Sequence, residues 1–195
     1  MSAGARLEAE GLAVARGGRL LLAGLDFALG PGEALLLLGP NGVGKTSLLR
    51  CIAGLLAPFA GRISNPFAVA IAGGEPALKP EQRLLSELCF WARLDGADEA
   101  AVRQAMEAMA LAPLAGLPCG WLSAGQRQRA ALARLIASGA PLWLLDEPTA
   151  MLDRASIARL RAAIERHLGR GGLVVAATHQ PDELPDGRAL HLTPA

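Results

Sequence analysis

Eight consecutive residues, Gly39-Pro40-Asn41-Gly42-Val43-Gly44-Lys45-Thr46, fit the pattern G-x-x-x-x-G-K-[ST] and are followed by Ser47. Glycines in such a loop let backbone N–H groups turn toward phosphate oxygens, and a helix that begins there adds the positive end of its dipole. The Lys45 ammonium can reach the outer phosphates and act in catalysis, while the Thr46 hydroxyl can ligate Mg²⁺. The loop therefore predicts a nucleoside triphosphate site; the alternative is a glycine-rich turn without a ligand.

Two acids, Asp146 and Glu147, directly follow the apolar run 142–145. Ligands of open α/β sheets bind at the carboxyl ends of the strands, which is where these acids would stand. Asp146 can hold Mg²⁺ through water, and Glu147 can polarise the water that attacks a γ-phosphate. Alone the pair could be a solvated turn or a helix cap, but together with the glycine loop it indicates phosphoryl transfer.

A second glycine-bearing helix start, Ser123-Ala124-Gly125-Gln126, precedes an Arg-rich and Ala-rich segment. Ser123 can act as the N-cap, and the free N–H groups beside Gly125 would form a second anion site. One nucleotide has one γ-phosphate, but the chain has two loops that could bind a phosphate. This suggests that two copies of the chain meet head to tail, with each nucleotide shared between them. The alternative is a simple capping box between Ser123 and Gln126.

His179 follows the apolar run 173–177, which is the third such run to deliver a polar residue at its carboxyl end. A neutral imidazole there could hydrogen-bond the γ-phosphate or orient the attacking water. His167 and His191 are interpreted as structural, with His191 in a terminal strand.

Elements that could position these residues follow from the hydrophobic pattern. The runs 34–38, 142–145 and 173–177 are continuously apolar, as parallel strands covered on both faces require. Residues 7–15 and 20–29 predict an antiparallel pair joined at Gly17-Gly18. We expect an α/β fold in one domain over 1–195, with a helical lobe at about 76–121. The predicted helices are 45–53, 81–94, 98–110, 124–137 and 155–168.

Composition narrows the class of protein. Of 195 residues 52% are hydrophobic, yet the longest charge-free stretch, 108–126, contains Pro113 and Pro118 and cannot span a membrane as a regular helix. The net charge is +1 and no basic run exceeds two residues, which argues against a nucleic-acid partner. Three cysteines outside any CxxC pattern and an N-terminus without an apolar segment predict a reduced cytosolic protein without a signal peptide.

In order and spacing, the motifs resemble those of the ATP-binding-cassette (ABC) ATPases over nearly the whole chain. The resemblance implies a P-loop NTPase with a mostly parallel sheet, a trimmed N-terminal antiparallel portion and a small helical subdomain. It also implies ATP and Mg²⁺ as cofactors and a homodimer that sandwiches two ATP molecules, with Ser123 and Gly125 on the partner's γ-phosphate. The matching segments are 39–46 (Walker A), 122–126 (signature), 142–147 (Walker B and catalytic glutamate), 150–153 (D-loop) and His179 (switch histidine).

Within the motifs and beside them, the exact residues of four segments resemble the ATPase subunits of bacterial cytochrome c maturation (haem exporter) transporters. The segments are 76–81, 122–129, 142–148 and 178–181. This resemblance implies a peripheral protein on the cytoplasmic side of the inner membrane. Its ATP hydrolysis would be coupled to integral membrane subunits that release haem, or its chaperone complex, for cytochrome c assembly.

Departures from the family pattern occur in three places. Glu75 stands where a glutamine is usual; its oxygen could still ligate Mg²⁺, although it adds negative charge. Arg16 occupies the neighbourhood where an aromatic residue commonly stacks on adenine, and the chain has no tyrosine; a guanidinium plane can also stack on a base. Only about twenty residues separate Ala53 from Glu75, which predicts a shortened antiparallel portion.

Rival functions remain open at this point. The chain could serve an ABC transporter for another solute, because nothing in an ATPase subunit reads the solute. It could also be a nucleotide-gated binding module without turnover, given Glu75 and the missing aromatic residue. A DNA-repair or translation cassette is disfavoured, since those need long insertions or two cassettes in one chain.

Overall fold

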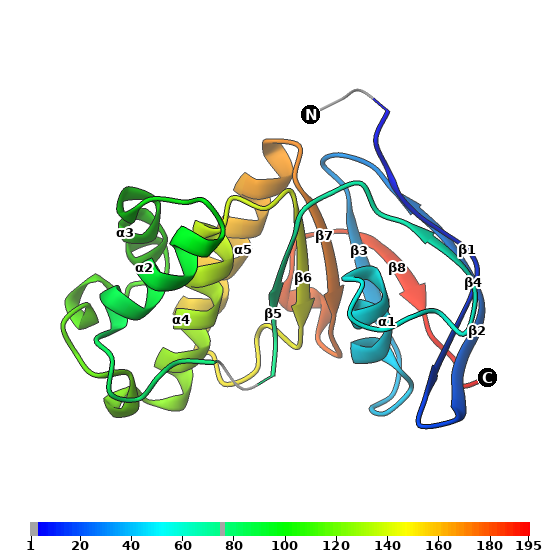
Figure 1. The fold of residues 1–195 in the computed structure, drawn as a ribbon, viewed down its shortest axis with the longest axis horizontal. Helices are drawn as coiled ribbons and strands as arrows, with labels where there is room; N and C mark the ends of the chain where they lie inside the picture. Colours follow the sequence, from blue (N-terminus) through cyan, green and yellow to red (C-terminus); the bar gives the residue numbers. More distant parts are fainter. Residues whose placement is uncertain (1–3, 75–76) are drawn as a thin grey trace.

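A parallel sheet of five strands forms the centre of the computed structural model, which describes residues 4–74 and 77–195 (Figure 1). Its strand order is β5-β6-β7-β3-β8. Parallel strands bring their carboxyl ends to one edge, so residues that follow β3, β6 and β7 become neighbours. The strand bounds are β3 (Ala34–Leu38), β5 (Val69–Ala72), β6 (Leu142–Asp146), β7 (Leu173–Ala177) and β8 (Arg188–His191).

A second sheet is antiparallel, with strand order β2-β1-β4. β1 (Leu7–Arg16) and β2 (Arg19–Leu29) form the predicted hairpin, and β4 (Ala60–Ser64) pairs with the other edge of β1. Gly17 and Gly18 have φ of 57° and 79°, a conformation that two-residue hairpin turns require and that glycine adopts without strain. The hairpin prediction is confirmed, whereas β4 and β5 were not predicted.

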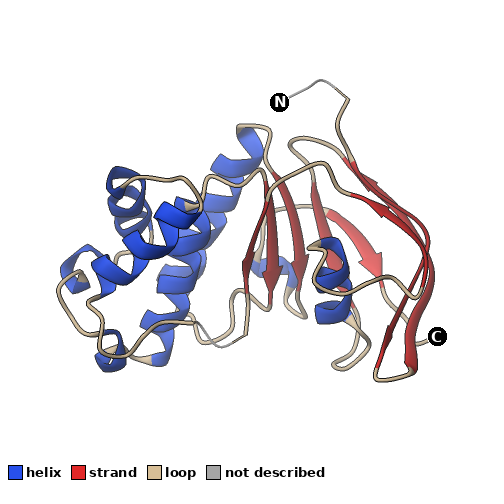
Figure 2. Cartoon of the chain, viewed as in Figure 1, coloured by secondary structure: helices blue, strands red, loops and turns tan. Residues whose placement is uncertain are grey.

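The helices cover the two faces of the parallel sheet differently (Figure 2). α1 lies between the two sheets, where Leu48 and Ile52 share a core with β1 and with the face of β3 that carries Leu35. The opposite face of the sheet, which carries Trp143, packs against α4 and α5. The helix bounds are α1 (Lys45–Ile52), α2 (Leu84–Leu94), α3 (Glu99–Ala108), α4 (Ala124–Ala137) and α5 (Arg154–Gly169).

The helical region at the left of Figure 1 contains α2, α3 and the 3₁₀ turns Ala112–Leu114 and Cys119–Trp121, packed on α4. α3 begins as predicted, because the Asp98 carboxylate accepts the N–H of Ala101 at 2.9 Å. α2 begins at Leu84 rather than Glu81, since the backbone before it pairs with 117–119 instead. A separate lobe over 76–121 stays a prediction, and its first residue lies outside the described ranges.

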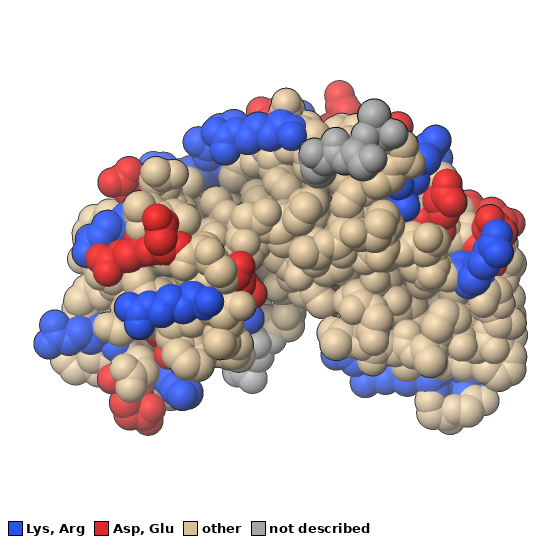
Figure 3. All heavy atoms as spheres, turned by 45° about the horizontal axis from the view of Figure 1, so that its top comes forward, with Lys and Arg blue, Asp and Glu red and all other residues tan. Residues whose placement is uncertain are grey.

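The surface carries both signs of charge. Figure 3 shows Lys and Arg interspersed with Asp and Glu over much of the visible face, and a row of Lys or Arg atoms along the lower edge of its right-hand part. Within 4–74 and 77–195, no helix combines the length and the apolarity needed to cross a bilayer.

His167 is a structural residue, as predicted. Its ring stacks on Trp143 with centroids 3.9 Å apart, and its Nε2 lies 3.1 Å from the carbonyl oxygen of Pro141. A Cβ on Gly172 would collide with this ring, so glycine is needed there. Burial lowers the pKa of His167, because the stacked ring loses the solvation that its charged form needs.

This lowered pKa predicts a loss of stability in acid. The unfolded chain binds a proton at His167 as the pH falls through 6.5, while the folded chain does not, so the free energy of unfolding decreases below that pH. The expected contribution is below about 1 kcal/mol at pH ~5.5, since the ring is partly exposed. Urea unfolding at pH ~7.5 and ~5.5 measures it. His167→Phe should show a smaller difference between the two pH values, and His191→Gln, at an exposed strand position, is the control. An unchanged difference in His167→Phe contradicts the prediction.

Candidate functional site

The glycine loop joins β3 to α1, as the sequence predicts, and its glycines are required by the backbone. Gly42 and Gly44 have φ of 80° and 120°. At Gly39 φ is 151°, and a Cβ there would lie 2.7 Å from the carbonyl oxygen of Leu192. Because side chains at these positions would be strained or would clash, the loop can present backbone N–H groups to a bound anion.

Lys45 is buried inside this loop, with only 6% of the residue exposed. Its Nζ donates to the carbonyl oxygen of Gly39 at 2.8 Å and lies 3.8 Å from Oε1 of Glu147. The ammonium thus faces a carbonyl dipole and a carboxylate that can be replaced by phosphate oxygens. The Lys45 ammonium thus lies inside the glycine loop, where a lysine of the G-K-[ST] pattern would contact phosphate oxygens.

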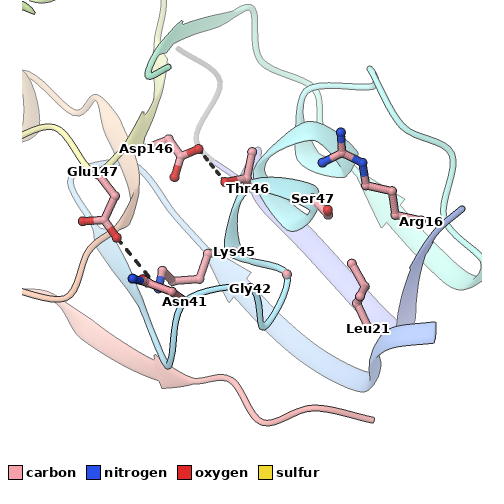
Figure 4. A pocket seen from close by; sticks show the side chains of 10 residues that line it. Arg16, Leu21, Asn41, Gly42, Lys45, Thr46, Ser47, Asp146 and Glu147 are labelled. Atoms are coloured by element: carbon pink, nitrogen blue, oxygen red, sulfur yellow. Dashed lines mark hydrogen bonds and ion pairs between the residues drawn. The ribbon is translucent and has the colours of Figure 1, made fainter. Parts of the chain in front are cut away.

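Thr46 and Asp146 meet across the junction of α1 and β6. The Thr46 hydroxyl donates to Oδ2 of Asp146 at 2.6 Å (Figure 4). A hydroxyl and a carboxylate beside a phosphate loop are the hard oxygen donors that Mg²⁺ takes when it also binds a nucleotide. These two residues therefore fit the predicted metal site. Glu75, the third predicted ligand, lies outside the described residues.

Glu147 stands between Lys45 and His179. Its backbone has φ 48°, and its N–H donates to the carbonyl oxygen of Ala177 at 2.9 Å. Its Oε2 lies 2.7 Å from Nδ1 of His179, and its side chain is 28% exposed against 56% for the histidine. A water molecule can therefore reach the carboxylate and the imidazole together, which is the arrangement that general base catalysis needs.

One pocket collects most of the predicted phosphate-site residues and two others (Figure 4). Arg16 and Leu21 come from the β1–β2 hairpin, far from the carboxylates in Figure 4. Leu21 was not predicted; the signal for it was its position on β2, which pairs with the end of β1 that carries Arg16. The lining residues are Arg16, Leu21, Asn41, Gly42, Gly44, Lys45, Thr46, Ser47, Asp146 and Glu147.

Gly73, at the end of β5, was also not predicted. A Cβ there would collide with the Cβ of Asp146, because Ala72 pairs with Leu145 in the parallel sheet. Glycine at this position leaves room for Asp146 to reach Thr46. The signal was the short apolar run 69–72 followed by glycine, which could have been interpreted as one more strand.

The residues 123–126 lie outside this pocket. The Ser123 hydroxyl accepts the N–H of Gln126 at 3.2 Å, and the Gln126 side chain accepts the N–H of Ser123 at 2.8 Å, so the capping box is present. Ser123 and Ala124 are exposed. A Cβ on Gly125 would lie 2.9 Å from the carbonyl oxygen of Met151. The segment 150–153 therefore packs closely against the start of the helix. None of these residues lines the pocket of its own chain.

Comparison with known proteins agrees with this geometry. A family model described as ABC transporter matches residues 22–150. The chain is 53% identical to the "Cytochrome c biogenesis ATP-binding export protein CcmA" of Rhodospirillum rubrum, over 94% of this chain and 84% of the relative. It is 49% identical to the protein of that name from Sphingopyxis alaskensis, over 92% of this chain and 93% of the relative.

Among solved structures, the ATP binding subunit of an ABC transporter superposes with a TM-score of 0.85 at 22% identity, over 98% of this chain and 90% of that one. That likeness confirms the fold, an α/β P-loop NTPase domain. The family model covers more than half of the chain, and the two relatives are about half identical to it along nearly its whole length. On this evidence the chain belongs to the ABC transporter family, among its ATP-hydrolysing subunits.

Proposed function

We propose that this chain hydrolyses ATP for a transporter that exports haem, or releases it with its chaperone complex, for cytochrome c biogenesis. The observation that carries the ATPase part is the meeting of Lys45, Thr46, Asp146 and Glu147 in one pocket. The names of relatives at 53% and 49% identity support the cytochrome c part.

In the proposed reaction, Lys45 leaves its contact with Gly39 and binds the outer phosphates of ATP. Glu147 accepts a proton from the water that attacks the γ-phosphate, and His179, 2.7 Å away, orients that water or the phosphate. Thr46 and Asp146 would hold Mg²⁺, which supplies neutralisation of phosphate charge. Lys45, Thr46, Asp146 and Glu147 already line the same pocket, and His179 adjoins it through its contact with Glu147.

The experiment that tests this function compares strains with and without the chain. A strain lacking it should lose its c-type cytochromes, and the wild-type chain, but not Glu147→Gln, should restore them. Restoration by both would favour a nucleotide-gated module without turnover. Normal cytochromes in the deleted strain, with loss of export of some other solute, would assign the ATPase to another transporter.

A homodimer in the ATP-bound state is part of the proposal. The exposed residues Ser123 and Ala124 and the N–H groups near Gly125 lie outside their own pocket, so a bound γ-phosphate would be reached from a second copy. The positive end of α4 would then face the shared nucleotide. The capping box uses the N–H groups of Ser123 and Gln126 and leaves those of Ala124 and Gly125 for the phosphate.

Ser123→Asp tests the dimer without breaking the helix. Aspartate caps a helix as well as serine does, but its charge would repel the γ-phosphate of the partner's nucleotide. We expect unchanged ATP binding to the monomer and a loss of hydrolysis of about tenfold or more. Ser123→Asn, an equally good but neutral cap, is the matched control and should retain more activity. Equal hydrolysis by Ser123→Asp and the wild type would contradict the sandwich.

Membrane subunits would dock on the helical region that follows residue 77. Phe90, Leu94 and Trp121 expose 46%, 65% and 76% of their surface there. Beside them a pocket contains Glu87, only 3% exposed, whose carboxylate accepts the indole N–H of Trp91 at 3.0 Å. Exposed apolar side chains in the same helical region as a polar pocket suit a partner helix with a polar anchor. Co-purification of a multi-span protein, lost when Trp121 is replaced by Ser, tests this docking and a peripheral location on the cytoplasmic side of the inner membrane.

A further inference from the structure

The nucleotide pocket has a phosphate end and a base end. Lys45 and Thr46 fix the position of the phosphates, with Glu147 and Asp146 beyond them (Figure 4). The opposite end of the same pocket is lined by the hairpin residues Arg16 and Leu21. A nucleotide with its phosphates on the loop must therefore place its base against Arg16 and Leu21.

The side chains at the base end have a distinctive chemistry. Leu21 is partly buried and offers an apolar surface on which a base can pack. Arg16 is exposed, and no hydrogen bond or ion pair joins its guanidinium to any side chain or backbone group within the described ranges. No aromatic residue is among the described residues that line the pocket. The polar group available to recognise the base is thus a guanidinium with all its donors free.

A guanidinium has five N–H donors and no acceptor. The O6 and N7 atoms of guanine are both acceptors and match two of these donors, as in the most common arginine–base pair. On this edge adenine offers only N7, and its 6-amino group is a donor that opposes the guanidinium. A guanidinium at the N7 edge of the base therefore favours 6-oxopurines over adenine.

We propose that Arg16 recognises the O6/N7 edge of the purine, so that this site binds and hydrolyses GTP and inosine triphosphate as well as ATP. The inference rests on the proposed nucleotide site and adds a base specificity to it. If Arg16 instead stacked on the plane of the base, it would contact adenine and guanine alike and would not distinguish them.

Competition binding tests this. A fluorescent ADP analogue is displaced by ATP, GTP or inosine triphosphate from the full chain in EDTA, so that no hydrolysis occurs. We expect GTP and inosine triphosphate to bind about threefold to tenfold more tightly than ATP. This is the low end of the discrimination that one bidentate contact provides, because Arg16 is exposed to solvent. Inosine has O6 and N7 but lacks the 2-amino group, so equal binding of the two 6-oxopurines identifies the edge that is recognised.

Variants of the hairpin separate the alternatives. Arg16→Ala should bind the three nucleotides equally, and Arg16→Tyr should stack on all of them and also lose the preference. Arg19→Ala is the matched control, since Arg19 pairs with Arg16 across the hairpin but does not line the pocket. Its preference should be that of the wild type.

Other outcomes overturn the inference. Equal binding of ATP and GTP by the wild type would mean that Arg16 stacks or points away. Equal weakening of all three nucleotides in Arg16→Ala would mean that it contacts phosphate. No binding of any nucleotide, with a folded chain, would instead remove the proposed function itself, so the two failures are distinguishable.

Discussion

Lys45→Ala is expected to abolish ATP hydrolysis, with a loss of about 100-fold or more in rate. The Lys45 ammonium is the only cation within the described lining of the pocket that lies next to the carboxylates, and it is already aimed into the glycine loop by Gly39. Without it, the charge on the outer phosphates has no protein counter-charge, and both binding and transition-state stabilisation suffer. Phosphate release by the purified chain, with and without its membrane partner, measures the effect.

Arg50→Ala is the control for that variant, because Arg50 is an exposed cation on the same helix, α1. Its hydrolysis rate should equal that of the wild type. Thermal unfolding of both variants shows whether the fold is intact. Wild-type hydrolysis by Lys45→Ala would remove the mechanism proposed here.

Glu147→Gln is expected to bind ATP but to hydrolyse it about 100-fold to 1000-fold more slowly. Glutamine has the shape of glutamate and can still contact His179, yet it cannot accept a proton from water. ATP would therefore persist in the site, and the sandwich of two chains should accumulate. Light scattering with ATP and Mg²⁺ should report a doubled mass, while ADP should leave the single-chain mass.

The double variant Lys45→Ala, Glu147→Gln provides the control for that dimer. It should stay monomeric in ATP, because the nucleotide that would join the two chains no longer binds. A monomeric Glu147→Gln chain under all conditions would count against the homodimer. Rapid phosphate release by Glu147→Gln would assign the proton transfer to another group.

Much of the site was predictable because its residues stand at the ends of apolar strands. The glycine loop follows β3, the two acids end β6 and follow it, and His179 follows β7, so the common edge of a parallel sheet brings them together. The contact between Glu147 and His179 is a direct result of the pairing of β6 with β7. Local sequence and one general rule of sheet geometry were sufficient here.

Other features depend on contacts that no local pattern reveals. β4 is an edge strand whose residues are mostly exposed, and β5 has only four residues, so neither carries a clear periodic signal. The need for glycine at position 73 arises from the register of β5 against β6. The late start of α2 arises from pairing of its preceding backbone with 117–119, which is distant in sequence.

Lys45 also bears on which anions the glycine loop can bind. Its ammonium is bound by the carbonyl oxygen of Gly39 and attracted by Glu147, so the loop neutralises itself without a counter-ion. Free inorganic phosphate would have to replace these internal partners with few contacts of its own. A triphosphate replaces them while gaining contacts along the whole pocket, as far as Leu21. The internal partners of Lys45 thus favour an extended polyphosphate ligand over a single inorganic phosphate or sulfate ion.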